Sequence, residues 1–305
     1  MSSIANQLRY GFVSIVVASV LMAGSTLAYL SFRGQIEQTK QLQYERAQAA
    51  AVEISAELDN LQRQLNYLSE LRGLTEFNAE TQRSILEGLV NSNSAYEVVG
   101  IFNSKGQIVQ AISPYESFSI SSLNLAGISA ETPLFWETFG QTQNYVSPVD
   151  VDLKTGVNAV NLAVPVRDNK NQISGVLFAR VSLSFLTQIA ARSKVGKTGY
   201  SYVLDHRSVV ISETGSKINP YLLQDLKGRS FVRELSKLAL ASGIQSPIVY
   251  KGLRGEEVMG TGAIVRRVQW MVVVELPTAE AYAPVRKLIY VMGAVTLASA
   301  LVAVG

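Results

Sequence analysis

The sequence lacks cysteine and contains a single histidine, His206. The lack of cysteine excludes disulfides, thiolate metal sites and cysteine nucleophiles, and one histidine cannot form a zinc site built mainly from histidines. The net charge at pH 7 is only +3, and no run of five or more basic residues occurs, so no nucleic-acid partner is indicated. We therefore expect neither a cofactor nor a metal ion.

Catalytic motifs are lacking as well. No Gly-x-Ser-x-Gly motif is present, and paired carboxylates such as Asp150 and Asp152 are too common in loops to indicate an acid and a base. Residues 191–198 fit a loose phosphate-loop pattern, but a working phosphate loop follows a strand and opens a helix. Here a predicted helix precedes the loop and a predicted strand follows it. His206 lies on a predicted turn, where an exposed imidazole is common. The sequence therefore indicates no enzyme in this chain.

Two long uncharged segments are present, one near each end. Residues 10–32 span about 23 residues without a charged side chain, enough helix to cross a ~30 Å hydrocarbon core. The second segment follows Arg286, and we expect a second span over residues 287–305 that continues past the given chain. The alternatives are a cleaved signal peptide with a cleavage site at residues 26–28, and a buried core helix for the second segment.

A heptad pattern follows the first segment. Apolar residues recur there at alternating three- and four-residue spacing, which is typical of a helix with one apolar seam. No proline interrupts this stretch, so one helix is predicted from the membrane to about Arg72. Two interpretations of the seam stay open: the helix lies on its own domain, or it contacts a second copy in a parallel dimer. The seam comprises Tyr44, Ala47, Ala51, Ile54, Leu58, Leu61, Leu65 and Leu68.

From Tyr96 the apolar period changes to two, which is typical of strands. A hairpin is predicted over residues 96–112, with its turn at 103–106. The other elements predicted in this half are strands at 144–152, 157–167 and 172–183 and a helix at 183–192.

A weaker second copy of this order follows, so the predicted fold class is α+β, with a long N-terminal helix and two stacked modules. Its predicted elements are strands at 200–204 and 209–211, helical segments at 221–226 and 231–241, and strands at 246–251, 256–266 and 269–276.

Two stretches carry a family resemblance. Residues 195–205, VGKTGYSYVLD, look like the opening of a membrane-proximal Cache module, and residues 145–148, YVSP, followed by the hairpin into residues 175–177, give a second match. With the order of elements, the chain resembles the double Cache sensor domains of bacterial receptors, whose modules are PAS-like. The resemblance implies a cytoplasmic tail and five further segments. These are the tail at 1–9, a span at 10–32, a helix and connector at 33–95, a membrane-distal module at 96–192, a membrane-proximal module at 193–286 and a span at 287–305.

The resemblance also implies a function. We expect the ligand-sensing region of a receptor in the bacterial inner membrane, with the main domain in the periplasm, membrane lipid around its spans and a second copy as its dimer partner. A small molecule would bind the distal module, and the second span would relay the change to a cytoplasmic output, with a histidine kinase favoured over a chemotaxis or cyclic-nucleotide domain. The alternatives are a membrane-anchored assembly protein that works through its coiled helix, and an extracytoplasmic enzyme.

Amino-acid-binding members of the family use an arginine and two aromatic residues on a helix, followed by an aspartate on a later strand. The aromatics fall here at Phe135 and Trp136. Pro133 stands in place of the arginine and Arg180 in place of the aspartate, so this motif is not matched.

The candidate ligand site combines aromatic walls with a few polar groups, as small-molecule pockets do. The aromatic residues could equally be ordinary core. Arg180 lies in an apolar strand, where an arginine is unfavourable unless paired. It either pairs with an internal acid, which we favour, or binds an anionic ligand. The candidate residues are Tyr115, Phe135, Trp136, Tyr145, Asp150 and Arg180.

Overall fold

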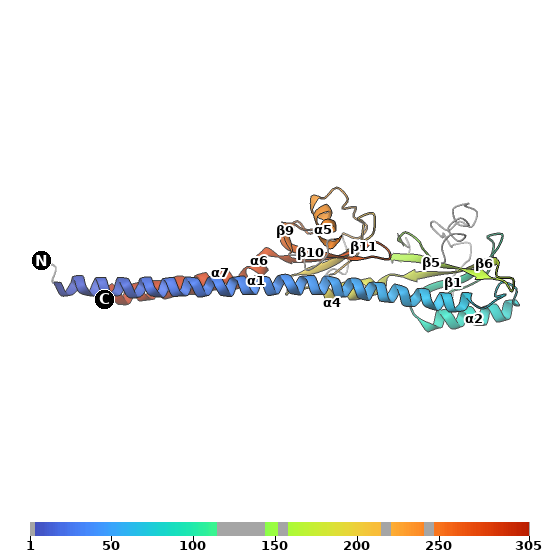
Figure 1. The fold of residues 1–305 in the computed structure, drawn as a ribbon, viewed down its shortest axis with the longest axis horizontal. Coiled ribbons are helices and arrows are strands. Elements are labelled where there is room, and N and C mark those ends of the chain that lie inside the picture. Colours follow the sequence, from blue (N-terminus) through green and yellow to red (C-terminus); the bar gives the residue numbers. More distant parts are fainter. Residues whose placement is uncertain (1–3, 115–143, 152–157, 215–220, 241–246, 305) are drawn as a thin grey trace.

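One helix organises the molecule. The computed structural model describes residues 4–114, 144–151, 158–214, 221–240 and 247–304. Helix α1 (Ile4–Ser69) runs along nearly the whole length of the molecule (Figure 1). Helix α7 (Ala283–Val304) lies beside the N-terminal half of α1, so both termini lie at the same end. Among the described residues, no helix is long and apolar enough to cross a membrane.

The sheet farther from the termini, which we call the distal sheet, is antiparallel and has six strands. Its order is β2-β1-β6-β5-β3, and β4 also pairs with β5. Strands β5 and β6 pair along almost their whole length, which makes them the centre of the sheet. The strands are β1 (Tyr96–Asn103), β2 (Ile108–Ile112), β3 (Tyr145–Val146), β4 (Asp150–Val151), β5 (Asn158–Arg167) and β6 (Ile173–Ser182).

The second sheet, the proximal sheet, repeats this arrangement with five strands in the order β8-β7-β11-β10-β9. In both sheets the first strand of the module lies between the second and the last. The predicted α+β fold with a long N-terminal helix and two antiparallel sheets is therefore confirmed. The strands are β7 (Tyr200–Leu204), β8 (Val210–Glu213), β9 (Ile248–Lys251), β10 (Glu257–Val265) and β11 (Trp270–Pro277).

Four shorter helices connect these parts in the described residues. The sequence did not indicate α2 (Ala79–Ser92), which packs on β1 and β2 and is capped by Asn78, whose side chain accepts a hydrogen bond from the Thr81 N–H at 2.8 Å. Helix α4 links the two sheets, and α6 joins β11 to α7. The remaining bounds are α4 (Ser184–Ser193), α5 (Ser230–Leu240) and α6 (Thr278–Ala281).

The heptad seam of α1 is buried inside the domain. Ala47, Ile54, Leu61 and Leu65 are fully buried, in one core cluster with residues from both sheets. α1 contacts β5 and β6 of the distal sheet and β10 and β11 of the proximal sheet. The first interpretation of the seam is therefore the one observed, and a dimer contact along this stretch has to use another face of the helix.

Two predicted elements are wrong. The strand expected at 144–152 is divided into β3 and β4 around Pro148, because proline has no N–H to donate to a ladder. The helix expected at 221–226 is a turn at 221–223 followed by an isolated bridge between Asp225 and Val209. Leu223 has a φ of 65° and donates its N–H to the Val210 carbonyl at 2.8 Å, so its backbone is committed to the edge of β8 rather than to a helix.

Candidate ligand-binding site

The face of the distal sheet that points away from α1, which we call the outer face, is apolar at one end. Alternate residues of β5 and β6 point to opposite faces, so Leu162 and Leu177 join the α1 core while Ala163 and Phe178 lie on the outer face. The rings of Phe102 and Phe178 lie 4.7 Å apart between centroids. This end therefore holds a buried apolar cluster, in which Phe178 and Ala163 are fully buried.

The other end of the outer face is polar and centres on Arg180. The Arg180 side chain is only 10% exposed, with Nε 3.3 Å from Glu97 Oε2 and Nη1 3.2 Å from Asp150 Oδ2. Of the two interpretations of this arginine, pairing with internal acids is the one observed. Two carboxylates face one guanidinium, so the cluster carries an excess of one negative charge.

Asn161 lies beside this cluster. It is opposite Arg180 in the β5–β6 ladder and is fully buried. Both backbone groups of Asn161 are bonded to Ser147. The Asn161 N–H donates to Ser147 Oγ at 2.8 Å, and the Ser147 N–H donates to the Asn161 carbonyl at 2.9 Å. Among the described residues, neither Nδ2 nor Oδ1 of the side chain has a hydrogen-bond partner. A buried amide left in this state costs about 1–3 kcal/mol.

Three of the six predicted site residues can be placed. Tyr115, Phe135 and Trp136 lie outside the described residues. Asp150 and Arg180 are in contact, and Tyr145 is paired with Ala163 at the edge of the same outer face. Burial raises the pKa of Tyr145, which keeps its hydroxyl protonated.

Sequence reasoning missed Glu97 and Asn161. A polar residue at a core position of an otherwise apolar strand is the signal that could have found Asn161, whose neighbours on β5 are alanine, valine and leucine. Glu97 is located by a register shift between Tyr96 and Val98, which a sequence pattern does not reveal.

The outer face of the proximal sheet is filled by the chain itself. Glu275 is fully buried, and its Oε1 accepts hydrogen bonds from Tyr202 Oη and Tyr250 Oη, both at 2.7 Å. Its Oε2 accepts the Leu253 N–H at 3.1 Å. Burial, reinforced by the charge of Glu275, raises the pKa of both tyrosines far above the ordinary value. Two tyrosine hydroxyls thus occupy Oε1 of this carboxylate, and a backbone N–H occupies Oε2.

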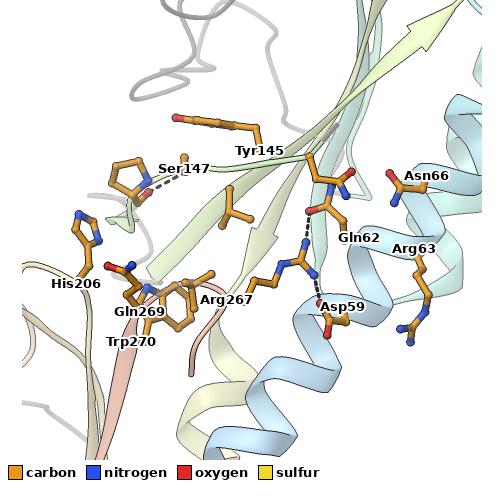
Figure 2. A pocket seen from close by; sticks show the side chains of 14 residues that line it. Asp59, Gln62, Arg63, Asn66, Tyr145, Ser147, His206, Arg267, Gln269 and Trp270 are labelled. Carbon is orange, nitrogen blue, oxygen red and sulfur yellow. Dashed lines mark hydrogen bonds and ion pairs between the residues drawn. The ribbon is translucent and has the colours of Figure 1, made fainter. Parts of the chain in front are cut away.

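A separate hollow of about 870 Å³ lies where α1, β3 and the tip of the proximal sheet meet (Figure 2). We call it the junction groove. Arg267 forms an ion pair with Asp59 and donates from Nη2 to Gln62 Oε1 at 3.0 Å. Gln62 Nε2 in turn donates to Asn144 Oδ1 at 3.3 Å. One chain of polar contacts therefore joins the helix to both sheets, and Tyr145 and Trp270 also line the hollow.

A Cache-domain family model matches residues 32–285. The chain belongs to the Cache domain family. A search of curated protein sequences found no match.

Solved structures show the same fold as this Cache domain. The extracellular domain of the proposed histidine kinase soHK1S-Z6 aligns with a TM-score of 0.58 and 17% identity, covering 84% of this chain and 99% of that one. The ligand-binding domain of the chemoreceptor Tlp3 of Campylobacter jejuni, solved with L-valine, aligns with a TM-score of 0.55 and 15% identity, covering 85% and 97%. That of the chemoreceptor PctB of Pseudomonas aeruginosa, solved with L-Gln, aligns with a TM-score of 0.53 and 14% identity, covering 81% and 96%.

In this Cache domain the phosphate-loop-like stretch holds a side chain of the protein. The loop follows α4 and precedes β7, the order that the sequence indicated. Glu280 of α6 accepts the N–H groups of Lys197 and Thr198, both at 2.7 Å, and the Thr198 hydroxyl. Burial alone would raise the pKa of Glu280, but these hydrogen bonds and the Lys197 charge hold it below the ordinary value. The loop thereby ties the proximal module to the helix that leads into α7.

Proposed function

We propose that this Cache domain is the extracellular sensing region of a bacterial transmembrane receptor and that its small-molecule ligand binds the outer face of the distal sheet. The observation that carries the proposal is the Asn161 side chain, which is buried beside the apolar cluster without a partner among the described residues. A buried amide of this kind needs a hydrogen-bond partner that the described residues do not supply, and a bound molecule can provide it.

The polar end of the ligand would meet Asn161, and its apolar part would lie on Phe102 and Phe178. An anionic ligand at Arg180 would be repelled by Glu97 and Asp150, because both carboxylates already contact the guanidinium. Asn161 can donate and accept without any such repulsion.

We further propose that Tyr115, Phe135 and Trp136 line the same site as Tyr145. Their support is the family resemblance, in which an aromatic pair precedes the residue at Tyr145. In several solved relatives the bound molecule is an amino acid, such as L-valine in Tlp3 and L-Gln in PctB. Pro133 and Arg180 depart from the charges of the amino-acid motif, so we expect a ligand of different chemistry here.

Residues 10–32 and 287–305 are proposed to anchor the receptor in the inner membrane, with residues 33–286 in the periplasm. Both segments lack charged residues apart from Lys287. The N-terminal half of α1 and most of α7 extend past both sheets (Figure 1). Apolar side chains there, such as Met22, Leu27 and Leu297, are more than two thirds exposed, which lipid contact would explain.

The receptor is proposed to act as a homodimer through the exposed face of α1, where Leu42, Val52 and Tyr67 are exposed. We favour a histidine kinase as the cytoplasmic output, as in the proposed kinase soHK1S-Z6, with a chemotaxis domain as in Tlp3 or a cyclic-nucleotide domain as the alternative. A change at the distal sheet would reach α7 through α1, which packs on both sheets, and through the hydrogen bonds that Lys197 and Thr198 donate to Glu280. The rival assembly protein loses its main support, because the α1 seam is used inside the domain.

A thermal-shift screen of a metabolite library against the chain in lipid nanodiscs tests this function. We expect at least one compound to raise the unfolding temperature, since a ligand that binds only the folded state stabilises it. Asn161→Leu should abolish that shift, whereas Asn169→Ala, which removes an exposed amide from the β5–β6 turn, should preserve it. A shift that is equal in both variants would contradict the assignment of the site.

A further inference from the structure

We propose that the junction groove is a second binding site, which borders the outer face of the distal sheet at Tyr145, and that it takes a neutral polyhydroxylated molecule such as a small saccharide. Its walls come from α1, from the edge strand β3 and from the turn between β10 and β11. Figure 2 shows Tyr145, His206, Gln269 and Arg267 around the hollow.

Two of the three charged residues that line the groove, Asp59 and Arg267, cancel one another. Asp59 and Arg267 form an ion pair across the gap between α1 and the β10–β11 turn. Arg63 also belongs to the lining, but its side chain points away from the centre of the hollow in Figure 2. A charged ligand would have to break the Asp59–Arg267 pair to find a counter-charge, which favours a neutral ligand.

The remaining polar groups suit hydroxyls. Asn66, Asn144 and Gln269 each carry a side-chain amide, which donates and accepts, whereas Gln62 is buried and already bonded to Arg267 and Asn144. A sugar hydroxyl also donates and accepts, so each amide can serve it in either direction. Half-buried Tyr145 adds an aromatic surface for the C–H face of a ring.

The size also fits. A hollow of about 870 Å³ falls within the ordinary range for small-molecule sites, about 300–1,000 Å³. A second hollow of about 510 Å³ shares Asn66 and Asn144 with it and continues along α1 toward Arg167. Amide groups therefore border both hollows, which gives room for a second sugar unit.

Occupancy would be coupled to the arrangement of the modules. The polar chain from Asp59 through Arg267 and Gln62 to Asn144 joins the helix, the proximal sheet and the distal edge. A ligand that bonds Asn144 and Gln269 bridges the two sheets directly, so it binds most tightly to one separation of them.

Calorimetry on the chain in lipid nanodiscs, which avoids sugar-based detergents, tests the site. The probes are D-glucose, D-galactose and maltose, with benzoate and butylammonium as charged probes of similar size. We expect at least one saccharide to bind with a Kd of about 1 mM or less and the charged probes not to bind. Asn144→Ala and Gln269→Asn should each weaken binding by about tenfold, the loss of one or two hydrogen bonds.

Two controls separate this site from the other. Asn60→Ala removes an α1 amide that does not line the hollow and should leave the Kd within twofold. Asn161→Leu should leave saccharide binding intact, so failure of the distal site does not count against the groove. In a Trp136→Phe background Trp270 is the remaining tryptophan, and its fluorescence should change with the same Kd. The proposal is overturned if no saccharide binds, if the charged probes bind as well, or if Asn144→Ala and Gln269→Asn leave the Kd unchanged.

Discussion

The two sheets place opposite chemistry at the same strand position. Arg180 and Glu275 each lie two residues before the end of the last strand of their module. Opposite Arg180 stands Asn161, whereas opposite Glu275 stands Gly260. A Cβ on Gly260 would lie 2.3 Å from Tyr250 Oη, so the missing side chain is what lets that phenol reach the carboxylate.

The difference separates a face whose polar groups are bonded within the chain from a face that we propose binds a ligand. In the proximal sheet the space over the strands is occupied by Tyr200, Tyr202 and Tyr250, and both oxygens of Glu275 are bonded. In the distal sheet a buried amide has no partner among the described residues. One fold repeated twice thus has a face filled by bonded side chains in one module and, as we propose, a ligand site in the other.

The largest expected effect is on the filled face. Glu275→Ala leaves the hydroxyls of Tyr202 and Tyr250 buried without an acceptor and opens a cavity, so the free energy of unfolding should fall by about 4 kcal/mol. Denaturant unfolding measures it, with Glu234→Ala on the exposed side of α5 as the control, expected within about 0.5 kcal/mol of wild type. A loss below about 1 kcal/mol would show that the tyrosines do not depend on this carboxylate.

The next effect is on the polar end of the distal face. Arg180→Met leaves Glu97 and Asp150 without their cation, and the loss should be about 2–3 kcal/mol, less than for a fully buried pair because Asp150 is 30% exposed. Arg83→Met breaks an exposed pair with Glu87 and should change stability by no more than about 0.5 kcal/mol. Equal effects of the two substitutions would remove the distinction between these arginines.

Asn161→Leu should have the opposite sign. Leucine has the same branching and the same number of side-chain heavy atoms as asparagine, and it removes a buried amide that has no partner among the described residues, so the unliganded protein should gain about 1–2 kcal/mol. A stability gain combined with lost ligand binding is typical of a residue kept for recognition. Destabilisation on denaturant unfolding would instead assign Asn161 a structural role.

The smallest effect is expected at Glu280 and the loop that bonds to it. Glu280→Gln weakens the hydrogen bonds from Lys197 and Thr198 and should remove about 1 kcal/mol at pH 7. The pKa of Glu280 is lowered from its ordinary 4.5, so this stabilisation is fully present above that value and is lost as the pH falls through the lower folded-state value. Thermal unfolding of both proteins between pH 7 and pH 3 should therefore show curves that converge on the acid side.

Local patterns were sufficient to predict much of the fold. The period of two located the strands of both sheets, and the heptad spacing located the buried side of α1. The helix expected at 221–226 does not form because the Leu223 N–H donates to the Val210 carbonyl at the edge of β8. The sequence pattern did not predict helix α2 because only four of its residues are buried and polar residues occupy most of its positions.

The chemistry of the candidate site was less accessible from sequence. Arg180 was found because an arginine in an apolar strand is conspicuous, but its partners come from β1 and β4, which only the pairing of the sheet brings together. The burial of Asn161 depends on the same pairing. The hydrogen bonds of Glu280 likewise join it to Lys197 and Thr198, which precede it by 83 and 82 positions in the sequence.

Hydrogen exchange in the presence and absence of a ligand found by the screen tests the contrast between the two faces most directly. The account predicts that the ligand slows exchange in peptides from β5 and β6, residues 158–182, and leaves β7, β10 and β11 unchanged apart from the peptides next to Glu280. Slowed exchange centred on β7 and β11 around Tyr200 and Glu275, with β5 and β6 unaffected, would contradict it.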